Sequence, residues 1–270
     1  MKGKVVIVTG ASSGIGRATA IEFARKGAQV VLAARSDNEL EVVKAEIEKL
    51  GGTCLSVKTD VSLEESCKNM IEKTIETYGQ IDVLVNNAGI SIRAILEDMQ
   101  LDTFKKVMDV NLYGAVYCTK YALPYLLKTK GSVVGVSSIA GYVGLPARTA
   151  YCASKSGLQG FLESLRIENR KTGLHVLVAC PGYTESNIRK KALNAVGESQ
   201  DESPINEGNI MPASAVARKL VRAVIKRKRR LTLTTEGILA VHIAKFFPGF
   251  IETQIFKRVT SEPGSPIRLK

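Results

Sequence analysis

The sequence has little of what a metal centre or a histidine-based catalytic triad requires. It contains only two histidines, His175 and His242, and its five cysteines are scattered without a CxxC pair. Zinc sites need closely spaced Cys and His ligands. We therefore expect no metal site, and we expect the cysteines to be reduced thiols of the protein core.

The pattern also lacks a targeting segment. Met1 leads directly into a strand-like run, without the cationic start, apolar stretch and small-residue cleavage site of a signal peptide. The apolar segment 237–256 is interrupted by His242, Lys245 and Pro248, whereas a bilayer span needs about 20 predominantly apolar residues. We therefore expect a cytoplasmic protein, with peripheral contact to a membrane surface left open.

Acidic residues are scarce only towards the C-terminal end. Residues 1–211 carry 25 Lys and Arg against 23 Asp and Glu, whereas residues 212–270 carry 13 against 3, which accounts for most of the net charge of +12. The basic run Lys226–Arg230 has no interleaved aromatic residues that could stack on nucleic acid bases. We expect no nucleic acid partner and interpret the run as a solvated helix end.

Short β-branched runs alternate with helical patterns through most of the 270 residues. Most of the runs are continuously apolar, as in strands that are covered on both faces. Repeated strand–helix–strand units predict an α/β fold, a doubly wound (Rossmann) parallel sheet of about seven strands with helices on both faces. The predicted strands are Lys4–Thr9, Gln29–Ala34, Thr53–Thr59, Ile81–Asn86, Ser132–Ser137, Leu174–Ala179 and Leu231–Thr235. The predicted helices include Gly14–Lys26, Asn38–Leu50, Ser62–Tyr78 and Phe104–Leu127.

A glycine-rich stretch follows the first predicted strand and opens the first predicted helix. Gly10 can make the tight turn, while Gly14 and Gly16 let the backbone approach a pyrophosphate at the positive helix N-terminus. In this strand–turn–helix context the pattern predicts a dinucleotide site. The predicted contacts are Gly10, Ser12, Ser13, Gly14, Ile15 and Gly16.

The spacing Gly-x-x-x-Gly-x-Gly resembles the cofactor turn of the short-chain dehydrogenase/reductase family, in its single-domain branch. The resemblance extends over about residues 3–235 and rests on several motifs in order, including NNAG at 86–89 and Pro181-Gly182 after the sixth strand. Ser186 stands where the family usually has threonine, and its hydroxyl can still bond the nicotinamide carboxamide. The resemblance implies a homodimer or homotetramer. It also implies cofactor contacts at Asp60, Val61, Asn87, Ala88, Gly89, Pro181, Gly182 and Ser186.

Asn111, Ser138, Tyr151 and Lys155 occupy the positions of the family's catalytic tetrad. Tyr151 and Lys155 are four residues apart, so on a helix they share one face. An ammonium about 4 Å from the phenol favours the phenolate by about 4 kcal/mol, roughly three pK units before desolvation, which poises Tyr151 for proton transfer near neutral pH. By resemblance, Ser138 holds the substrate oxygen, Lys155 also bonds the nicotinamide ribose, and Asn111 anchors a water that resupplies protons.

The second predicted strand ends without the acid that would bond the 2′-hydroxyl of NAD, because Ala34 stands there. Arg35 and Ser36 instead offer a guanidinium and a hydroxyl to a 2′-phosphate, and Arg17 can add a second positive charge. NADP(H) is therefore favoured over NAD(H). Reduction is the expected direction, because cellular NADP pools are largely reduced.

We expect residues 1–236 to form one dehydrogenase/reductase domain and residues 237–270 to form an apolar and basic C-terminal extension. The polar segment at about 183–212 is expected to be a substrate loop, with a plain surface loop as the alternative. Together with Ser91–Met99 and Ala140–Arg148 it is expected to line the substrate site. The apolar side chains expected there are Tyr142, Val143, Leu145 and Pro146.

Segment 237–256 is expected to fold as two short amphipathic pieces hinged at Pro248-Gly249. Three uses of this segment stay open. It can form a dimer interface, cover the substrate pocket, or bind an anionic membrane surface with the help of its basic neighbours.

These patterns predict an NADP(H)-dependent oxidoreductase that interconverts a carbonyl and an alcohol, with Tyr151 as general acid/base. A hydrophobic ketone, steroid or lipid-like carbonyl is the expected substrate. One alternative is a catalytically silent NADP-binding regulatory protein, which the intact tetrad disfavours. Another is an epimerase or dehydratase with the same Tyr/Lys pair, which the short chain and the glycine spacing disfavour.

Overall fold

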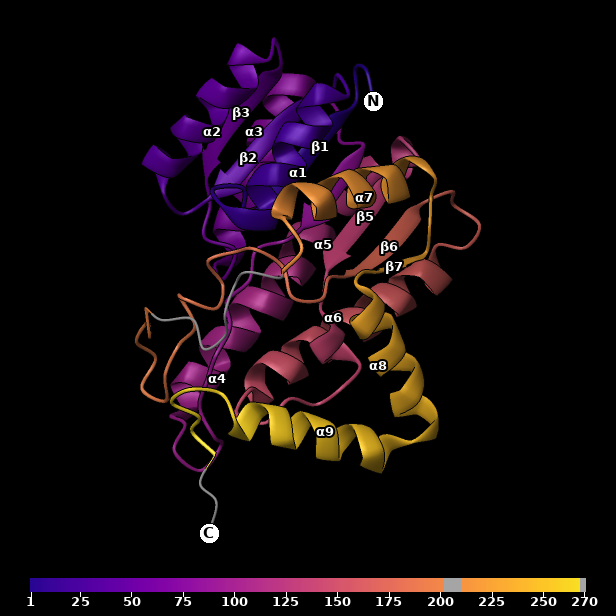
Figure 1. Ribbon diagram of the computed structural model, residues 1–270. Coiled ribbons are helices and arrows are strands. Elements are labelled where there is room, and N and C mark those ends of the chain that lie inside the picture. Colours follow the sequence, from indigo (N-terminus) through magenta and orange to yellow (C-terminus); the bar gives the residue numbers. More distant parts are fainter. Residues whose placement is uncertain (202–209, 268–270) are drawn as a thin grey trace.

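Seven parallel strands form one sheet in the order β3-β2-β1-β4-β5-β6-β7 (Figure 1). This computed structural model describes residues 1–201 and 210–267. The arrangement confirms the predicted doubly wound fold, with strand bounds that differ from the prediction by at most three residues. The strands are β1 (Val5–Thr9), β2 (Gln29–Ala34), β3 (Thr53–Lys58), β4 (Val83–Asn86), β5 (Ser132–Val136), β6 (His175–Cys180) and β7 (Arg230–Thr232).

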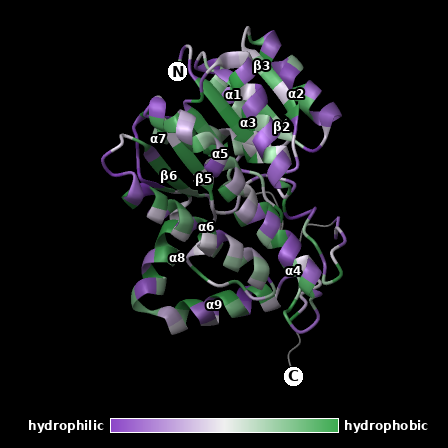
Figure 2. Cartoon of the chain, turned by 180° about the vertical axis from the view of Figure 1, so that it is seen from behind, coloured by the Kyte–Doolittle hydropathy of each residue, from purple (hydrophilic) through white to green (hydrophobic). Residues whose placement is uncertain are grey.

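Helices cover both faces of the sheet, which explains why the central strands are apolar at nearly every position. Every residue of β1, β5 and β6 is buried, and the strands appear in hydrophobic green in Figure 2. Helices α1, α2 and α7 pack on one face, and α3, α5 and α6 pack on the other. Their bounds are α1 (Gly14–Arg25), α2 (Asp37–Lys49), α3 (Glu64–Tyr78), α5 (Gly114–Lys128), α6 (Thr149–Glu168) and α7 (Ala213–Ile225).

The helix predicted over Phe104–Leu127 is interrupted in its first half. The structure has α4 (Leu101–Met108), then a π-helical turn, η1 (Asp109–Tyr113), and then α5. Asn111 lies in this turn and is 1% exposed. Single π-helical turns inside helices occur mostly at functional sites, and here the turn directs the Asn111 amide towards the carboxyl end of β4.

The strand order reverses between β1 and β4, which both pair in parallel with their neighbours on either side. In doubly wound sheets, the crevice beyond the carboxyl ends of the strands at such a reversal is the usual ligand site. The glycine turn follows β1 and the NNAG motif follows β4. The topology therefore brings these two motifs, 76 residues apart from Gly10 to Asn86, to the same crevice.

The polar segment 183–212 crosses this end of the sheet without a helix in its described part, and residues 202–209 of the predicted substrate loop lie outside the described residues. Leu193 forms a bridge with Ile92, and Thr184 forms one with Met211. The loop is thus held against the segment that follows β4.

Two helices follow β7, α8 (Thr235–Phe246) and α9 (Pro248–Thr260), and they meet at an angle around Phe247 (Figure 1). The expected break near Pro248-Gly249 is confirmed, because Pro248 opens α9 at a position where its missing N–H costs nothing. None of the helices in the described part of the chain is long and apolar enough to cross a membrane.

Candidate active site

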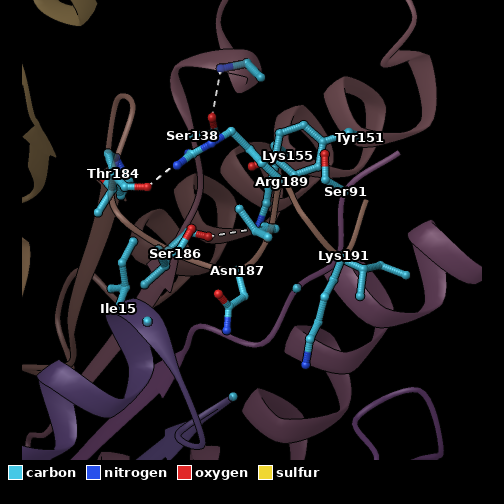
Figure 3. Close-up of a pocket in the computed structure, with 18 of the residues that line it drawn as sticks. Ile15, Ser91, Ser138, Tyr151, Lys155, Thr184, Ser186, Asn187, Arg189 and Lys191 are labelled. Atoms are coloured by element: carbon cyan, nitrogen blue, oxygen red, sulfur yellow. Dashed lines mark hydrogen bonds between the residues drawn. The ribbon is translucent and has the colours of Figure 1, made fainter. Parts of the chain in front are cut away.

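A cavity of about 1100 Å³ lies beyond the carboxyl ends of the strands. Figure 3 shows Ser138, Tyr151 and Lys155 among the side chains around it, with Ile15 and Ser186 contributed by other segments. The predicted cofactor and catalytic residues line this cavity, except Asn111 and Arg17. Among the described residues, no cluster of His, Cys, Asp or Glu could hold a metal ion.

The glycine turn has the geometry that a pyrophosphate needs. Gly10 has a φ of +65°, in the region that only glycine enters readily. A Cβ on Gly16 would stand 2.1 Å from the Gly10 carbonyl oxygen, so no larger residue fits there. Ser13 begins α1 without a capping side-chain bond, and the first turn has no acidic residue. Its free N–H groups and the helix dipole can therefore bind an anion.

The NNAG motif supports this turn directly. The Asn87 Nδ2 donates to the carbonyl oxygens of Thr9 at 2.9 Å and Gly10 at 3.3 Å. The Thr9 Oγ1 accepts hydrogen bonds at 3.0 Å from the backbone N–H groups of Asn87 and Ala88. These four bonds tie the ends of β1 and β4 together and hold the turn in shape.

The side chains beyond β2 differ in one respect from the expectation. Arg35 and Ser36 line the cavity as predicted, but Arg17 does not, and it forms an ion pair with Glu46 of α2 at 2.6 Å. The second positive charge expected from Arg17 is therefore absent from the site. Glu39 lines the cavity on the first turn of α2. The sequence pattern did not indicate this residue, because the acid that bonds the ribose of NAD is expected at the end of the strand.

Asp60 lies across from these residues, after β3. Its Oδ1 accepts hydrogen bonds from the Ser62 backbone N–H at 3.0 Å and from the Ser62 hydroxyl at 2.7 Å. The side chain is thus fixed in the cavity wall.

Tyr151 and Lys155 project from α6, one turn apart as their spacing predicted (Figure 3). The Lys155 ammonium lies 5.7 Å from the centre of the Tyr151 ring. Its Nζ donates to the Val136 carbonyl oxygen at 3.0 Å, and the residue is 3% exposed. Ser138 lines the same cavity, so its hydroxyl, the phenol and the ammonium all belong to one site.

The pKa values of Tyr151 and Lys155 are not those of the simple Lys–Tyr ion pair that the spacing suggested. Burial raises the pKa of Tyr151, and the opposing effects come from the Ser138 hydroxyl and the charge of Arg148. Burial also lowers the pKa of Lys155, to about 8. The Lys155 ammonium was expected to lower the phenol's pKa by roughly three units before desolvation. In the folded protein desolvation prevails, and the pKa of Tyr151 lies above its ordinary value.

Asn111 is fully occupied by neighbouring groups. Its Oδ1 accepts from the Ile90 backbone N–H at 2.8 Å, and its Nδ2 donates to the Ile90 carbonyl oxygen and to the Ser154 hydroxyl, both at 2.9 Å. Asn111 therefore links the π-helical turn, the segment after β4 and the catalytic face of α6.

Gln159 is a positioning residue that the sequence interpretation missed. It lies one turn beyond Lys155, and its Nε2 donates to the Ser137 hydroxyl at 3.0 Å and to the Ser138 carbonyl oxygen at 3.4 Å. The run 151, 155, 159 on one face of α6 was a signal for it. Gln159 holds the loop that presents the Ser138 hydroxyl.

The expected apolar wall of the substrate site is only half correct. Val143 and Leu145 line the cavity, but Tyr142 and Pro146 do not. Tyr142 instead faces the guanidinium of Arg230, 6.0 Å from the ring centre. Tyr142 directly follows the short 3-10 turn η2 (Ile139–Gly141), which points its side chain towards β7.

The C-terminal helices complete the cavity. Ile255, Arg258 and Val259 of α9 line it, as does Ala240 of α8. The start of α8 is packed against the turn after β6, where a Cβ on Gly182 would stand 2.4 Å from the Thr234 Oγ1. These contacts support one of the three uses left open for segment 237–256, which is to cover the substrate pocket.

A family model described as short chain dehydrogenase matches residues 4–196 of the chain. An 11-beta-hydroxysteroid dehydrogenase A from Sesamum indicum is 34% identical over 98% of this chain and 78% of its own length. An 11-beta-hydroxysteroid dehydrogenase 1A from Arabidopsis thaliana is 38% identical over 85% of this chain and 68% of its own. A dehydrogenase/reductase SDR family protein 7-like from Dictyostelium discoideum is 34% identical over 96% of this chain and 83% of its own length.

Among solved structures, the fold is similar to an alcohol dehydrogenase from the archaeon Thermococcus sibiricus complexed with 5-hydroxy-NADP. The TM-score is 0.75 at 27% sequence identity, and the match covers 85% of this chain and 95% of the other.

Proposed function

The chain belongs to the short-chain dehydrogenase family, and from this premise we propose that it is an NADP(H)-dependent oxidoreductase that interconverts a hydrophobic carbonyl compound and its alcohol. The observation that supports this best is the meeting of Tyr151, Ser138 and Lys155 in the same cavity as the glycine turn. We also propose that residues 1–236 are the dehydrogenase domain and residues 237–270 an extension that covers its pocket.

The residues of the chain divide the proton chemistry among them. Tyr151 donates its phenolic proton to the carbonyl oxygen in reduction and takes it back in oxidation. Ser138 hydrogen-bonds the same oxygen and stabilises its developing charge. Lys155, whose ammonium lies 5.7 Å from the centre of the Tyr151 ring, supplies positive charge near the phenol. When bound, the nicotinamide supplies or accepts the hydride, which is chemistry that no side chain can provide.

The substrate end of the cavity supports an apolar carbonyl compound. Its walls include Val143 and Leu145 after β5, Leu193 of the substrate loop, and Ile255 and Val259 of α9. The steroid-dehydrogenase names of several relatives are consistent with such a substrate. An NADPH-oxidation screen over steroids, other ketones, ketoacyl esters, quinones and aldehydes tests the proposal. Tight NADPH binding without turnover of any of them would favour the silent regulatory protein, and isomerised product without net cofactor use would favour an epimerase.

The preference for NADP(H) is supported by Arg35 and Ser36 at the cavity wall and by Ala34 in place of an acid. The NADP derivative bound to the archaeal alcohol dehydrogenase is in line with it. Glu39, which also lines the cavity, favours NAD(H) instead, because a carboxylate repels a 2′-phosphate and can bond ribose hydroxyls. The proposal requires that the attraction of Arg35 for the 2′-phosphate exceeds the repulsion by Glu39.

Substitution of Arg35 by alanine tests this balance. A charge-assisted hydrogen bond contributes about 1.5–3 kcal/mol, so we expect Arg35→Ala to raise the KM for NADPH by roughly 10- to 100-fold and to leave the KM for NADH nearly unchanged. Arg17→Ala is the matched control, because Arg17 pairs with Glu46 outside the cavity. Equal effects of Arg35→Ala on both cofactors would contradict the assigned preference.

The outer side of α8 and α9 supports a further partner. Phe246, Phe247 and Phe250 form an exposed corner, with 76%, 66% and 57% of their surfaces accessible. Large exposed apolar patches mark interaction sites. Lys245 and Lys257 are also exposed on the same helices, and lysines near an apolar face suit an anionic lipid surface. We propose peripheral membrane contact through this corner, in a protein that assembles as a homodimer or homotetramer.

Replacement of Phe246, Phe247 and Phe250 by serine should abolish flotation with anionic liposomes, while turnover of a water-soluble substrate stays within about twofold of the parent. The reason is that these rings supply the apolar area that would enter the headgroup region. Unchanged flotation would rule the corner out as a membrane contact. Loss of the oligomer in light scattering, without any flotation of the parent, would assign the corner to a subunit interface.

A further inference from the structure

The segment that follows α9 places one carboxylate between two arginines. The Glu262 Oε2 lies 3.5 Å from Arg93 Nη2 and 3.8 Å from Arg148 Nη2. The three side chains are 7%, 10% and 13% exposed, so the cluster is nearly shielded from water. Arg93 belongs to the segment after β4, Arg148 directly precedes α6, and Glu262 follows α9.

Backbone carbonyl groups hold both guanidinium groups in place. Arg93 Nη2 donates to the Pro263 carbonyl oxygen at 2.8 Å, and Arg148 Nη1 donates to the Ile92 carbonyl oxygen at 3.3 Å. Two cations and one anion leave the cluster with a net charge of +1. A buried charge that is not fully neutralised costs stability. Stabilisation of the fold alone therefore does not explain the second arginine.

The surplus charge and the catalytic phenol share one cavity. Arg148 precedes Tyr151 by three residues, and both side chains line the same cavity. The charge of Arg148 lowers the pKa of Tyr151 against the effect of burial. The other groups that face Tyr151 are the Ser138 hydroxyl, the Lys155 ammonium and two thiols. These thiols, Cys152 and Cys180, have pKa values raised by burial, that of Cys180 to about 11, and are neutral at neutral pH.

We propose that Arg148 and Glu262 are positioning residues for the proton transfer of Tyr151. Arg148 stabilises the phenolate through space, and Glu262 holds Arg148 in place while it offsets part of that charge. The C-terminal segment thereby sets the acidity of the catalytic tyrosine when it packs over the pocket. This inference rests on the proposed role of Tyr151 as general acid/base.

The test is a direct titration of Tyr151 that needs no substrate. The phenolate is followed by ultraviolet difference absorbance in the full chain, with Tyr151→Phe in the same background subtracted. We expect Arg148→Gln to raise the midpoint by about one pH unit or more, because a nearby opposite charge commonly shifts a pKa by about 1–3 units. We expect Glu262→Gln to lower the midpoint, since it leaves Arg148 uncompensated.

Two further variants separate electrostatics from packing. Arg148→Lys keeps the charge and should return the midpoint towards that of the parent. Arg93→Gln removes the bond to Pro263 and one contact of Glu262, so it loosens the same segment while the charge of Arg148 remains. We expect a midpoint near the parent's for Arg93→Gln, and thermal unfolding shows whether each variant is folded.

Opposite shifts in Arg148→Gln and Glu262→Gln support the proposal. Shifts in the same direction, or no shift in either, overturn it. If Arg148→Gln does not fold, a midpoint that is lower in Glu262→Gln than in Arg93→Gln supports the proposal, and equal midpoints overturn it. A protein that shows these shifts but oxidises no NADPH in the carbonyl screen would refute the proposed function and leave the electrostatic role intact.

Discussion

Tyr151→Phe should lower kcat/KM for carbonyl reduction by about 10³-fold while NADPH still binds with nearly the affinity of the parent. General acid catalysis contributes typically 10²- to 10⁴-fold, and the missing hydroxyl is the group proposed to deliver a proton to the carbonyl oxygen. The ring itself remains, so the packing around it is preserved. Steady-state kinetics and a fluorescence titration with NADPH measure the two effects separately.

Tyr142→Phe is the matched control for this variant. Tyr142 lies nine residues earlier, faces Arg230 and does not line the cavity, so its loss of a hydroxyl should leave kcat/KM close to that of the parent. Activity of Tyr151→Phe within tenfold of the parent would disprove the proposed proton transfer. A parallel loss of NADPH affinity would instead point to a damaged cofactor site.

Lys155→Met should remove activity and, at neutral pH, make the protein more stable. Burial lowers the pKa of Lys155 from 10.5 to about 8, a shift of about 2.5 units, and at pH 7 the folded protein therefore holds a charge at a cost of about 3 kcal/mol. Loss of the bond to the Val136 carbonyl oxygen offsets about 1 kcal/mol of this. We expect a net gain of about 2 kcal/mol in the free energy of unfolding.

The pH dependence of this gain identifies its cause. Because the folded-state pKa lies below the unfolded-state value, the cost is present in full below about pH 8 and disappears as the pH rises towards 10.5. The difference in unfolding free energy between Lys155→Met and the parent should therefore shrink over that range. Lys106→Met is the control, because Lys106 lines the cavity but is exposed. A constant difference across the range would exclude desolvation of Lys155 as the cause.

Much of the candidate site could be predicted because its motifs are local. The glycine turn, NNAG and Pro181-Gly182 each follow a strand directly, and parallel strands bring all their carboxyl ends to one edge of the sheet. Side chains that reach the site from elsewhere were not predictable in this way. Glu39 and Arg258 carry no spacing that distinguishes them from other charged residues on exposed helix faces.

The wrong expectations have a common physical cause. Arg17 was expected near the 2′-phosphate because it follows Gly16, and Tyr142 was expected in the substrate wall because it precedes Val143. Gly16 and Val143 do line the cavity. In the folded protein Arg17 turns to Glu46 and Tyr142 turns to Arg230. The direction of a side chain depends on partners from distant segments, and no local pattern names those partners.

The sequence by itself determined the parallel sheet, the dinucleotide turn and the shared face of Tyr151 and Lys155. These follow from periodicity and from the conformations open to glycine, which act over a few residues. Only the tertiary structure decided which charges act on the phenol and what closes the pocket. Arg93, Arg148 and Glu262 come from three segments of the chain, and α9, which follows β7 in the sequence, lines the cavity. Electrostatic effects depend on distance and burial in three dimensions, so they arise only when packing brings such segments together.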